Sequence, residues 1–487
     1  MNDLQLATVQ TRWKEGFHGP KFRRLYMILR DYILSGGLAP GTVLLPSRRL
    51  AAVLALSRNT VNQAYELLHS EGFVETRAGA GVYVTHDLPQ KGWSNKAVSQ
   101  NYGEDLPALA RRAEEWLHVH KRHQQGDKDR AFSSGRPALD DFPFDQWARL
   151  LSRRWRLCGE TLAISETVAG YQPLREHVCE YLQTTRGLNC TPDQVIILSG
   201  AQQGLDLIAR VLWEKGDRIV VEDPAYPGMD GVIRGIGAIA VPTEVDDEGL
   251  CLDKVRCADV KSFMVTPSRN YPLGTTMSLA RRLGLLEEAR RCNAWVIEDD
   301  FDGEFRFDGP PLSSLQGLDR EGRVLYVGTF SRIIFPALRL GYLVVPPNLL
   351  EPFLAAKSYS DGHTSILHQA ALADFFQEGY FSSHLRRMKK LYQERRRYLI
   401  ERLEQDFSSV LNVLPADGGL HVCTVFKQSV CDVQLCQKLS ESGVSVVPLS
   451  PFYRRGKPQQ GMIMGFAGYN QQKMDVAFSI MQKYWYK

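Results

Sequence analysis

The sequence predicts a multidomain protein that joins a small, mainly helical N-terminal module to a large α/β body. A chain of 487 residues is too long for a single hydrophobic core. The first 86 residues contain three helical patterns followed by two short alternating runs. From about residue 131 onward, short apolar runs rich in β-branched residues alternate with helical stretches. This alternation is typical of a mostly parallel sheet that is covered on both faces.

The N-terminal module, residues 15–86, has the pattern of a winged helix-turn-helix, mainly α with a β-wing. Hydrophobic spacing and turn residues predict three helices and two strands: helices over 21–35, 48–54 and 58–70, and strands over 73–76 and 82–85. We expect Ser47 to cap the second helix and Ser57 to cap the third. The glycine-bearing stretch from Arg77 to Gly81 would form the tip of the wing.

The positive charge of the chain lies in this module. Residues 1–86 hold ten Lys or Arg and six Asp or Glu, whereas the remaining 401 residues are balanced. Such segregation favours a polyanionic partner, although a solvated basic face would have the same composition. The third helix also carries Arg, Asn and Gln side chains, which read base edges. The predicted DNA-binding residues are Arg48, Arg49, Arg58, Asn59, Thr60, Asn62, Gln63, Arg77, Gly79 and Gly81.

Residues 87–130 are polar and are interpreted as a linker, with one predicted helix near 106–120. The body then follows over 131–487. Its predicted strands are 195–198, 218–221, 238–241, 262–265, 295–298, 324–327 and 341–345. The chain ends in a smaller α+β lobe, roughly residues 375–487.

The remaining features of the composition indicate the cellular compartment in which the protein works. No apolar run approaches the ~18 residues of a membrane span, and the N-terminus lacks the pattern of a secretory signal. The nine cysteines are scattered and form no C-x-x-C pair, which predicts reduced thiols and no metal site. We therefore expect a cytoplasmic protein without a membrane partner.

Two stretches of the chain resemble known families. Residues 45–84, LPSRRLAAVLALSRNTVNQAYELLHSEGFVETRAGAGVYV, closely resemble the DNA-reading module of GntR-type bacterial regulators. In the body, the motifs LSGAQQG, EDPAYP, VIEDD and GTFSRIIFPALRLGY resemble fold-type I aminotransferases, which use pyridoxal 5′-phosphate (PLP). The combination is similar to the MocR/GabR branch of GntR-type regulators. That resemblance implies a dimeric, aminotransferase-like sensor domain. A winged helix used only for protein docking is the alternative.

The resemblance also implies a cofactor site. Gly200, Ala201 and Gln202 would hold a phosphate on the amides of a helix start, and Asp299 would pair with the pyridinium nitrogen. The residues implied are Gly200, Ala201, Gln202, Tyr226, Asp299, Phe301, Thr329, Arg332 and Arg339. Tyr226 would stack on the ring, and Thr329 and Arg339 would bind the phosphate.

Several positions depart from the aminotransferase pattern. Arg332 stands where the family has the lysine that links PLP, and an arginine stays protonated and cannot form that bond. Phe301 replaces a tyrosine that contacts the cofactor. The strand over 462–466 lacks the arginine that holds a substrate carboxylate, a role for which Arg454 and Arg455 are candidates. We therefore expect no catalytic residues and no enzyme activity.

Further departures lie at 165–168, where the family has Tyr-Gly-Asp-Pro, and at Arg269-Asn270, where it has His-Gln. Arg332 alone could be an engineered change, but several departures together favour a site that has drifted from covalent chemistry. If PLP binds, we expect it to bind without a covalent link.

These observations favour a DNA-binding transcription regulator that senses PLP or a related anionic or amino-acid ligand. The resemblance implies a head-to-tail homodimer. A flexible linker of ~44 residues would reach ~35 Å, enough for each winged helix to cross to its partner. A PLP-dependent aminotransferase and a PLP-independent dimeric regulator remain the alternatives.

Overall fold

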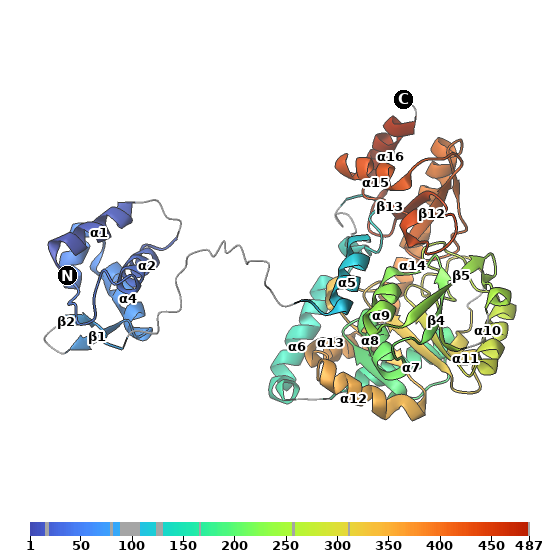
Figure 1. The fold of residues 1–487 in the computed structure, drawn as a ribbon, viewed down its shortest axis with the longest axis horizontal. Coiled ribbons are helices and arrows are strands. Elements are labelled where there is room, and N and C mark those ends of the chain that lie inside the picture. Colours follow the sequence, from blue (N-terminus) through green and yellow to red (C-terminus); the bar gives the residue numbers. More distant parts are fainter. Residues whose placement is uncertain are drawn as a thin grey trace. The chain divides into compact units, whose positions relative to one another are not determined.

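The computed structural model describes residues 1–14, 19–77, 81–87, 108–122, 130–164, 167–255, 259–309 and 312–485. The chain divides into two compact units, Met1–Pro107 and Ala108–Lys487 (Figure 1). Gly79, one of the predicted wing residues, lies outside the described residues. Each unit has its own hydrophobic core, and the two are described separately below.

The first unit is a helical bundle with a two-stranded wing. Its elements are α1 (Asp3–Lys14), α2 (Lys21–Leu34), α3 (Ser47–Leu54), α4 (Arg58–Ser70), β1 (Val74–Arg77) and β2 (Gly81–Val84). β1 and β2 pair antiparallel, with Val74 opposite Val84. The predicted winged helix-turn-helix fold is confirmed. Helix α1 was not predicted: it precedes residue 15 and contributes the fully buried Val9 to the same core.

The two predicted helix caps have different outcomes. Ser57 caps α4 as expected, because its hydroxyl accepts a hydrogen bond from the Thr60 amide at 3.1 Å. The prediction for Ser47 is wrong: α3 begins at Ser47 itself, after Pro46, and no side chain caps it. The first amides of α3 are therefore left open, beside the exposed Arg48 and Arg49.

The body is built on an eight-stranded mixed sheet in the order β3-β10-β9-β8-β7-β4-β5-β6. Its strands are β3 (Val195–Leu198), β4 (Arg218–Asp223), β5 (Ile239–Asp246), β6 (Gly249–Leu250), β7 (Val260–Val265), β8 (Trp295–Asp300), β9 (Val324–Thr329) and β10 (Gly341–Val344). The central strands are parallel, whereas β10 runs antiparallel to both β3 and β9. This arrangement confirms the predicted α/β body.

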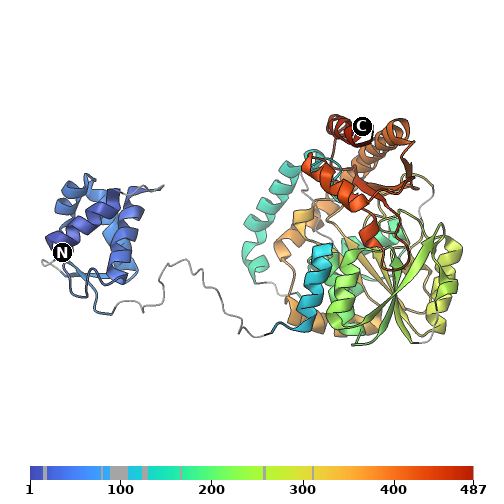
Figure 2. The same ribbon diagram turned by 45° about the horizontal axis from the view of Figure 1, so that its top comes forward.

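Helices cover both faces of this sheet, as Figure 2 shows. They are α6 (Phe144–Ala163), α7 (Gln172–Arg186), α8 (Ala201–Leu212), α9 (Pro227–Ile236), α10 (Leu279–Arg291), α11 (Leu315–Leu318), α12 (Leu350–Ser360) and α13 (Ile366–Gln377). Strand β3 shows why both faces need cover. Val195 and Ile197 belong to one buried cluster, while Ile196 and Leu198 belong to another. Successive strand residues point to opposite faces, so an all-apolar strand must be buried on both.

The C-terminal lobe is a four-stranded antiparallel sheet with three helices. Its elements are α14 (Tyr380–Phe407), β11 (Leu411–Val413), β12 (His421–Phe426), α15 (Asp432–Glu441), β13 (Val447–Pro448), β14 (Gly461–Gly465) and α16 (Gln471–Trp485). The strands lie in the order β11-β12-β14-β13. One face of the long helix α14 is buried, so this helix anchors the lobe to the body.

The stretch predicted as a linker contains α5 (Arg111–Arg122), close to the helix expected near 106–120. α5 belongs to the second unit and packs on α9. Beyond it, Ala131 pairs with Val444 of the C-terminal lobe. The chain between the two cores is therefore attached to the body at more than one place.

The cysteine prediction is correct in part. Seven cysteines are free thiols: Cys158, Cys179, Cys190, Cys251, Cys423, Cys431 and Cys436. Cys292 is disulfide-bonded, so the expectation that all the cysteines are reduced is wrong there. Among the described residues, no helix has both the length and the apolar character needed to span a bilayer.

The two separate cores give a prediction about stability. Leu68 of α4 is fully buried in the first unit. We expect Leu68→Ala to destabilise that unit by about 2–5 kcal/mol, because it removes buried apolar contacts and leaves a cavity. In calorimetry, the unfolding transition of the first unit should move to lower temperature and that of the body should stay in place. The neighbouring exposed variant Glu66→Ala is the control, and equal shifts in the two variants would contradict the prediction.

Candidate functional site

The exposed face of α4 carries most of the predicted base-reading residues. Val61, Ala64, Tyr65 and Leu68 turn inward, which leaves Arg58, Asn59 and Gln63 exposed and Thr60 and Asn62 half-buried. The Tyr65 hydroxyl donates to the carbonyl of Leu45 at 2.8 Å and fixes α4 against the chain that leads into α3. α4 therefore presents a polar surface from a rigid support.

The other predicted contacts surround this helix. Arg48 and Arg49 lie exposed in the first turn of α3, where open amides also favour an anion. On the wing, Arg77 forms an ion pair with Glu75 at 2.5 Å and lies over the Tyr83 ring at 4.7 Å. Gly81 has a φ of +112°, a backbone conformation that disfavours a side chain. Arg77 is thus partly engaged with its own wing.

A cavity of about 390 Å³ opens in the body at the carboxyl ends of β8 and β9. Of the predicted cofactor residues, all but Gly200 line it. The sequence reasoning missed the other lining residues, which are Ser134, Gly135, Arg136, Leu139, Leu205, Tyr271, Ser331 and Pro336. Ligands of α/β proteins usually bind at this edge of the sheet.

One end of the cavity is rich in hydrogen-bond donors. α8 begins after Gly200, whose φ is +99°, and a Cβ on Gly200 would lie only 3.1 Å from the Arg339 guanidinium. Arg339 Nη2 donates to the carbonyl of Ser199 at 2.9 Å. The Ser331 hydroxyl is buried with no hydrogen-bond partner, beside Thr329. A helix start, a guanidinium and a hydroxyl together suit a phosphate.

The other end offers a carboxylate and aromatic rings. Asp299 is buried at the end of β8, and its Oδ1 has no hydrogen-bond partner. Burial, and then the charges of the Asp300 and Glu222 carboxyls, raise the pKa of Asp299 to about 7. Tyr226 packs edge-to-face on Tyr271, with ring centroids 6.0 Å apart. An unpaired buried carboxylate beside aromatic rings suits a heteroaromatic ligand whose ring N–H donates a hydrogen bond.

Arg332 lies in the wall between the main cavity and a much smaller one near His421. Its guanidinium passes so close to Gly135 that a Cβ there would come within 1.5 Å of Nη1. Gly135 also has a φ of +80°. Arg136, the next residue, lines the main cavity as well. Arg136, Arg332 and Arg339 thus give this cavity a positive lining, which favours an anionic ligand.

The arginines considered as substrate-carboxylate ligands lie elsewhere. Arg454 pairs with Asp230 at 3.5 Å, and the Arg455 side chain is exposed. The backbone amides of both donate to the carboxylate of Asp223. Neither residue lines the cavity. Sequence spacing could not reveal this, because the partners are more than 220 positions away along the chain.

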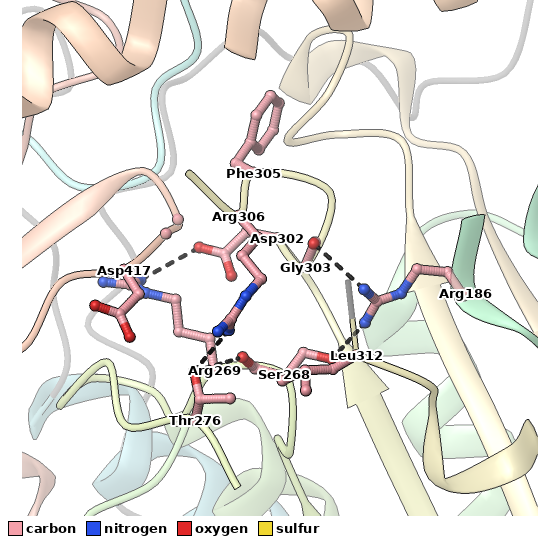
Figure 3. Close-up of a pocket in the computed structure, with 12 residues that line it drawn as sticks. Arg186, Ser268, Arg269, Thr276, Asp302, Gly303, Phe305, Arg306, Leu312 and Asp417 are labelled. Carbon is pink, nitrogen blue, oxygen red and sulfur yellow. Dashed lines mark hydrogen bonds and ion pairs between the residues drawn. The ribbon is translucent and has the colours of Figure 1, made fainter. Parts of the chain in front are cut away.

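A separate cavity, of about 20 Å³, lies between the loop after β8 and the C-terminal lobe (Figure 3). Arg269 pairs with Asp302 at 3.4 Å and donates to the carbonyl of His421 at 2.8 Å. Burial, and then the charge of Arg269, lowers the pKa of His421 well below its usual value. Arg306 Nη1 donates to the Thr276 hydroxyl at 3.4 Å. This cavity has room for about one water molecule, and its charges join the two lobes.

Within the residues that the structure describes, no group of three or more His, Cys, Asp or Glu side chains is arranged to hold a metal ion. Two histidines of the linker, His118 and His120, lie in α5, but their side chains are outside that description.

Comparison with known proteins agrees with this geometry. The family "Aminotransferase class I and II" matches residues 131–480, and "Bacterial regulatory proteins, gntR family" matches residues 21–84. Among solved structures, the α-aminoadipate aminotransferase LysN from Thermus thermophilus aligns with a TM-score of 0.70 and 26% identity. That alignment covers 77% of this chain and 96% of LysN.

Relatives along the whole chain are regulators. The probable rhizopine catabolism regulatory protein MocR of Rhizobium meliloti is 38% identical over 93% of this chain and 92% of its own length. The pyridoxine biosynthesis transcriptional regulator PdxR of Corynebacterium glutamicum is 28% identical over 91% of each chain. The chain therefore belongs to the MocR-type, GntR-family transcription regulators, in which a DNA-binding winged helix-turn-helix is joined to an aminotransferase class I and II domain.

Proposed function

We propose that this regulator reads operator DNA with α4 and that its body senses PLP, or a closely related anion, held without a covalent bond. The observation that carries the proposal is the composition of the main cavity. It combines an anion-binding end, an unpaired Asp299 oxygen and an arginine, Arg332, at the position implied for the linking lysine.

The cavity residues fit PLP. The open start of α8, Thr329, Ser331 and Arg339 would hold the phosphate, and Tyr226 would pack on the ring. Asp299 would accept a hydrogen bond from the protonated ring nitrogen, which supplies its Oδ1 with the missing partner. When bound in enzymes, PLP supplies an electron sink. The name of the Corynebacterium glutamicum relative, a regulator of pyridoxine biosynthesis, also supports a ligand of this chemical class.

Arg332 is compatible with ligand binding but not with a covalent link to PLP. Its guanidinium stays protonated at all physiological pH values and does not attack an aldehyde, so covalent linkage has no nucleophile at this position. The charge of Arg332 would instead attract a ligand with a second anionic group, such as a carboxylate. The absence of an arginine on β14 supports the same conclusion, because transamination needs a firmly held substrate carboxylate.

We further propose that the body forms a head-to-tail homodimer. α6 exposes the large apolar side chains of Phe144, Trp155 and Leu157, the exposed Ile164 follows its end, and Tyr359 at the end of α12 is 94% exposed. Exposed apolar side chains gathered on one helix are typical of an interaction surface. A dimer would present two winged helices to a two-fold DNA site.

The DNA-binding proposal predicts a large loss of specific affinity in the double variant Arg58→Ala, Gln63→Ala. Each residue can make a bidentate contact worth ~1–3 kcal/mol, so we expect at least ~30-fold weaker binding. The measurement is fluorescence anisotropy on a duplex that the wild-type protein has selected from random sequences. Arg218→Ala, an exposed arginine of the body, is the charge-matched control. Unchanged sequence preference in the double variant would contradict the assignment of α4.

The ligand proposal predicts a gain of chemistry in Arg332→Lys. We expect this variant to form a PLP adduct that borohydride makes permanent, because a lysine amine can lose its proton and attack the aldehyde. The wild-type protein should show a saturable change in PLP absorbance but no added mass after reduction. Arg339→Lys places a lysine at the phosphate end instead and should form no adduct. If Arg332→Lys gains no mass and the wild type shows no saturation, the cavity does not hold PLP.

A further inference from the structure

Helix α5 of the linker lies along α9 in the body, as Figures 1 and 2 both show. Trp116 Nε1 donates a hydrogen bond to the carbonyl of Gly231 at 2.9 Å. A Cβ on Gly235 would lie 2.6 Å from the same indole nitrogen, so the glycine permits the close approach. Glu115 pairs with Arg234 at 3.0 Å. The surface of α9 thus receives α5 through one aromatic ring, one hydrogen bond and one ion pair.

This contact leaves part of α5 open to solvent. Trp116 remains 46% exposed and Leu117 50% exposed, whereas Val119 is buried. A helix of 12 residues is marginal in water without tertiary contacts. Segments held by few buried contacts are the first to open in a native protein. α5 should therefore be helical while docked and unfold when released.

The opposite end of α9 reaches the main cavity. Tyr226 is the residue that precedes α9, and it lines the cavity. A Cβ on Gly228 would lie 2.2 Å from the Tyr226 ring, so ring and helix are in direct contact. Gln202, also in the cavity wall, donates to the carbonyl of Gly228 at 3.1 Å. A ligand that moves Tyr226 or Gln202 would therefore move the first turn of α9.

A chain of ion pairs connects α5 with the C-terminal lobe. Arg234, the partner of Glu115, also pairs with Asp230 at 3.1 Å. Asp230 in turn pairs with Arg454, which precedes β14 in the C-terminal lobe, at 3.5 Å. The Asp230 and Arg454 side chains are only 8% and 13% exposed, so solvent screens this pair less than a surface pair. The docking site of α5 thus touches both the cavity wall and the smaller lobe.

We propose that α5 is a reversible docking helix that couples the ligand cavity to the tether of the DNA-binding unit. With α5 docked, the chain that follows Asp87 is held on the body from α5 onward. With α5 released, the next described contact of this chain with the body is that of Arg130, which donates to the carbonyl of Ser440. Release therefore lengthens the chain between each winged helix and its first described contact with the body, and changes the spacing of half-sites that a dimer can span.

A ligand can shift this equilibrium only as far as it binds the two states differently. The direct contacts of Tyr226 and Gln202 with α9 provide that difference. The coupling of α5 to the ligand rests on the proposed ligand function, whereas the docking of α5 on α9 does not.

The test is hydrogen–deuterium exchange of the peptide covering α5 in the full-length protein, with and without PLP, with PLP absorbance recorded on the same samples. In the wild type, α5 amides should exchange at least ~10-fold more slowly than an unstructured chain. Trp116→Ala should abolish this protection, whereas Leu283→Ala, which truncates an exposed apolar side chain of α10, should keep it. Arg454→Gln should accelerate α5 exchange about threefold, because Asp230 and Arg234 lose a neighbour that orients them.

Each outcome decides one step. Unprotected α5 in the wild type, or equal protection in Trp116→Ala and Leu283→Ala, overturns the docking helix. Unchanged α5 exchange in Arg454→Gln overturns the link to the C-terminal lobe. PLP saturation without a change in α5 exchange overturns the coupling to the cavity. Absence of any PLP saturation overturns the proposed ligand instead, and the comparison of variants without PLP still decides the docking.

Discussion

The architecture of the body depends on how it neutralises the acidic side chains that leave β8. Asp299, Asp300 and Asp302 are all buried, and a buried carboxylate is costly unless it is paired. Asp300 is paired with Arg186 and accepts a hydrogen bond from the Tyr326 hydroxyl at 2.5 Å. Asp302 is paired with Arg269, which also binds the C-terminal lobe. Each of the three keeps one buried oxygen without a hydrogen-bond partner, but of the three only Asp299 lines the main cavity. Neutralising two carboxylates therefore joins the lobes and leaves the third for a ligand.

This arrangement explains how an aminotransferase-like body can serve a regulator. The features that we propose for holding a phosphate and a ring lie at turns and strand ends, which the fold supplies. The feature that makes the chemistry covalent is a single side chain, and position 332 carries an arginine. Under the proposed function, binding and catalysis would rest on different parts of the same cavity. A cavity that binds without reacting keeps its ligand unchanged, as reversible sensing requires.

The sequence predicted the parts of the fold whose signals are local. The strand runs, the Ser57 cap and the motifs at strand ends lie within a few residues of one another, so spacing reveals them. The sequence did not predict most features that depend on contacts between residues far apart along the chain. The Ser47 cap failed for a local reason instead: α3 begins at Ser47 itself, directly after Pro46. Arg136 and Tyr271 reach the cavity only through tertiary packing, as does Trp116 through its contact with α9. Arg454 likewise has the charge to bind a substrate carboxylate, but its side chain pairs with Asp230 instead.

The pairing of β3 with β10 has a consequence for folding during synthesis on the ribosome. β3 is an edge strand whose only partner in the sheet is β10, with Leu198 opposite Gly341. A ribosome adding ~5–20 residues per second needs roughly 7–30 s to travel between these positions. During that interval the apolar segment Val195–Leu198 has no strand to pair with, whereas the elements of the first unit have all been synthesised. Nascent chains should therefore carry a finished DNA-binding unit ahead of an unfinished, aggregation-prone body, and chaperones would be needed at this stage of synthesis.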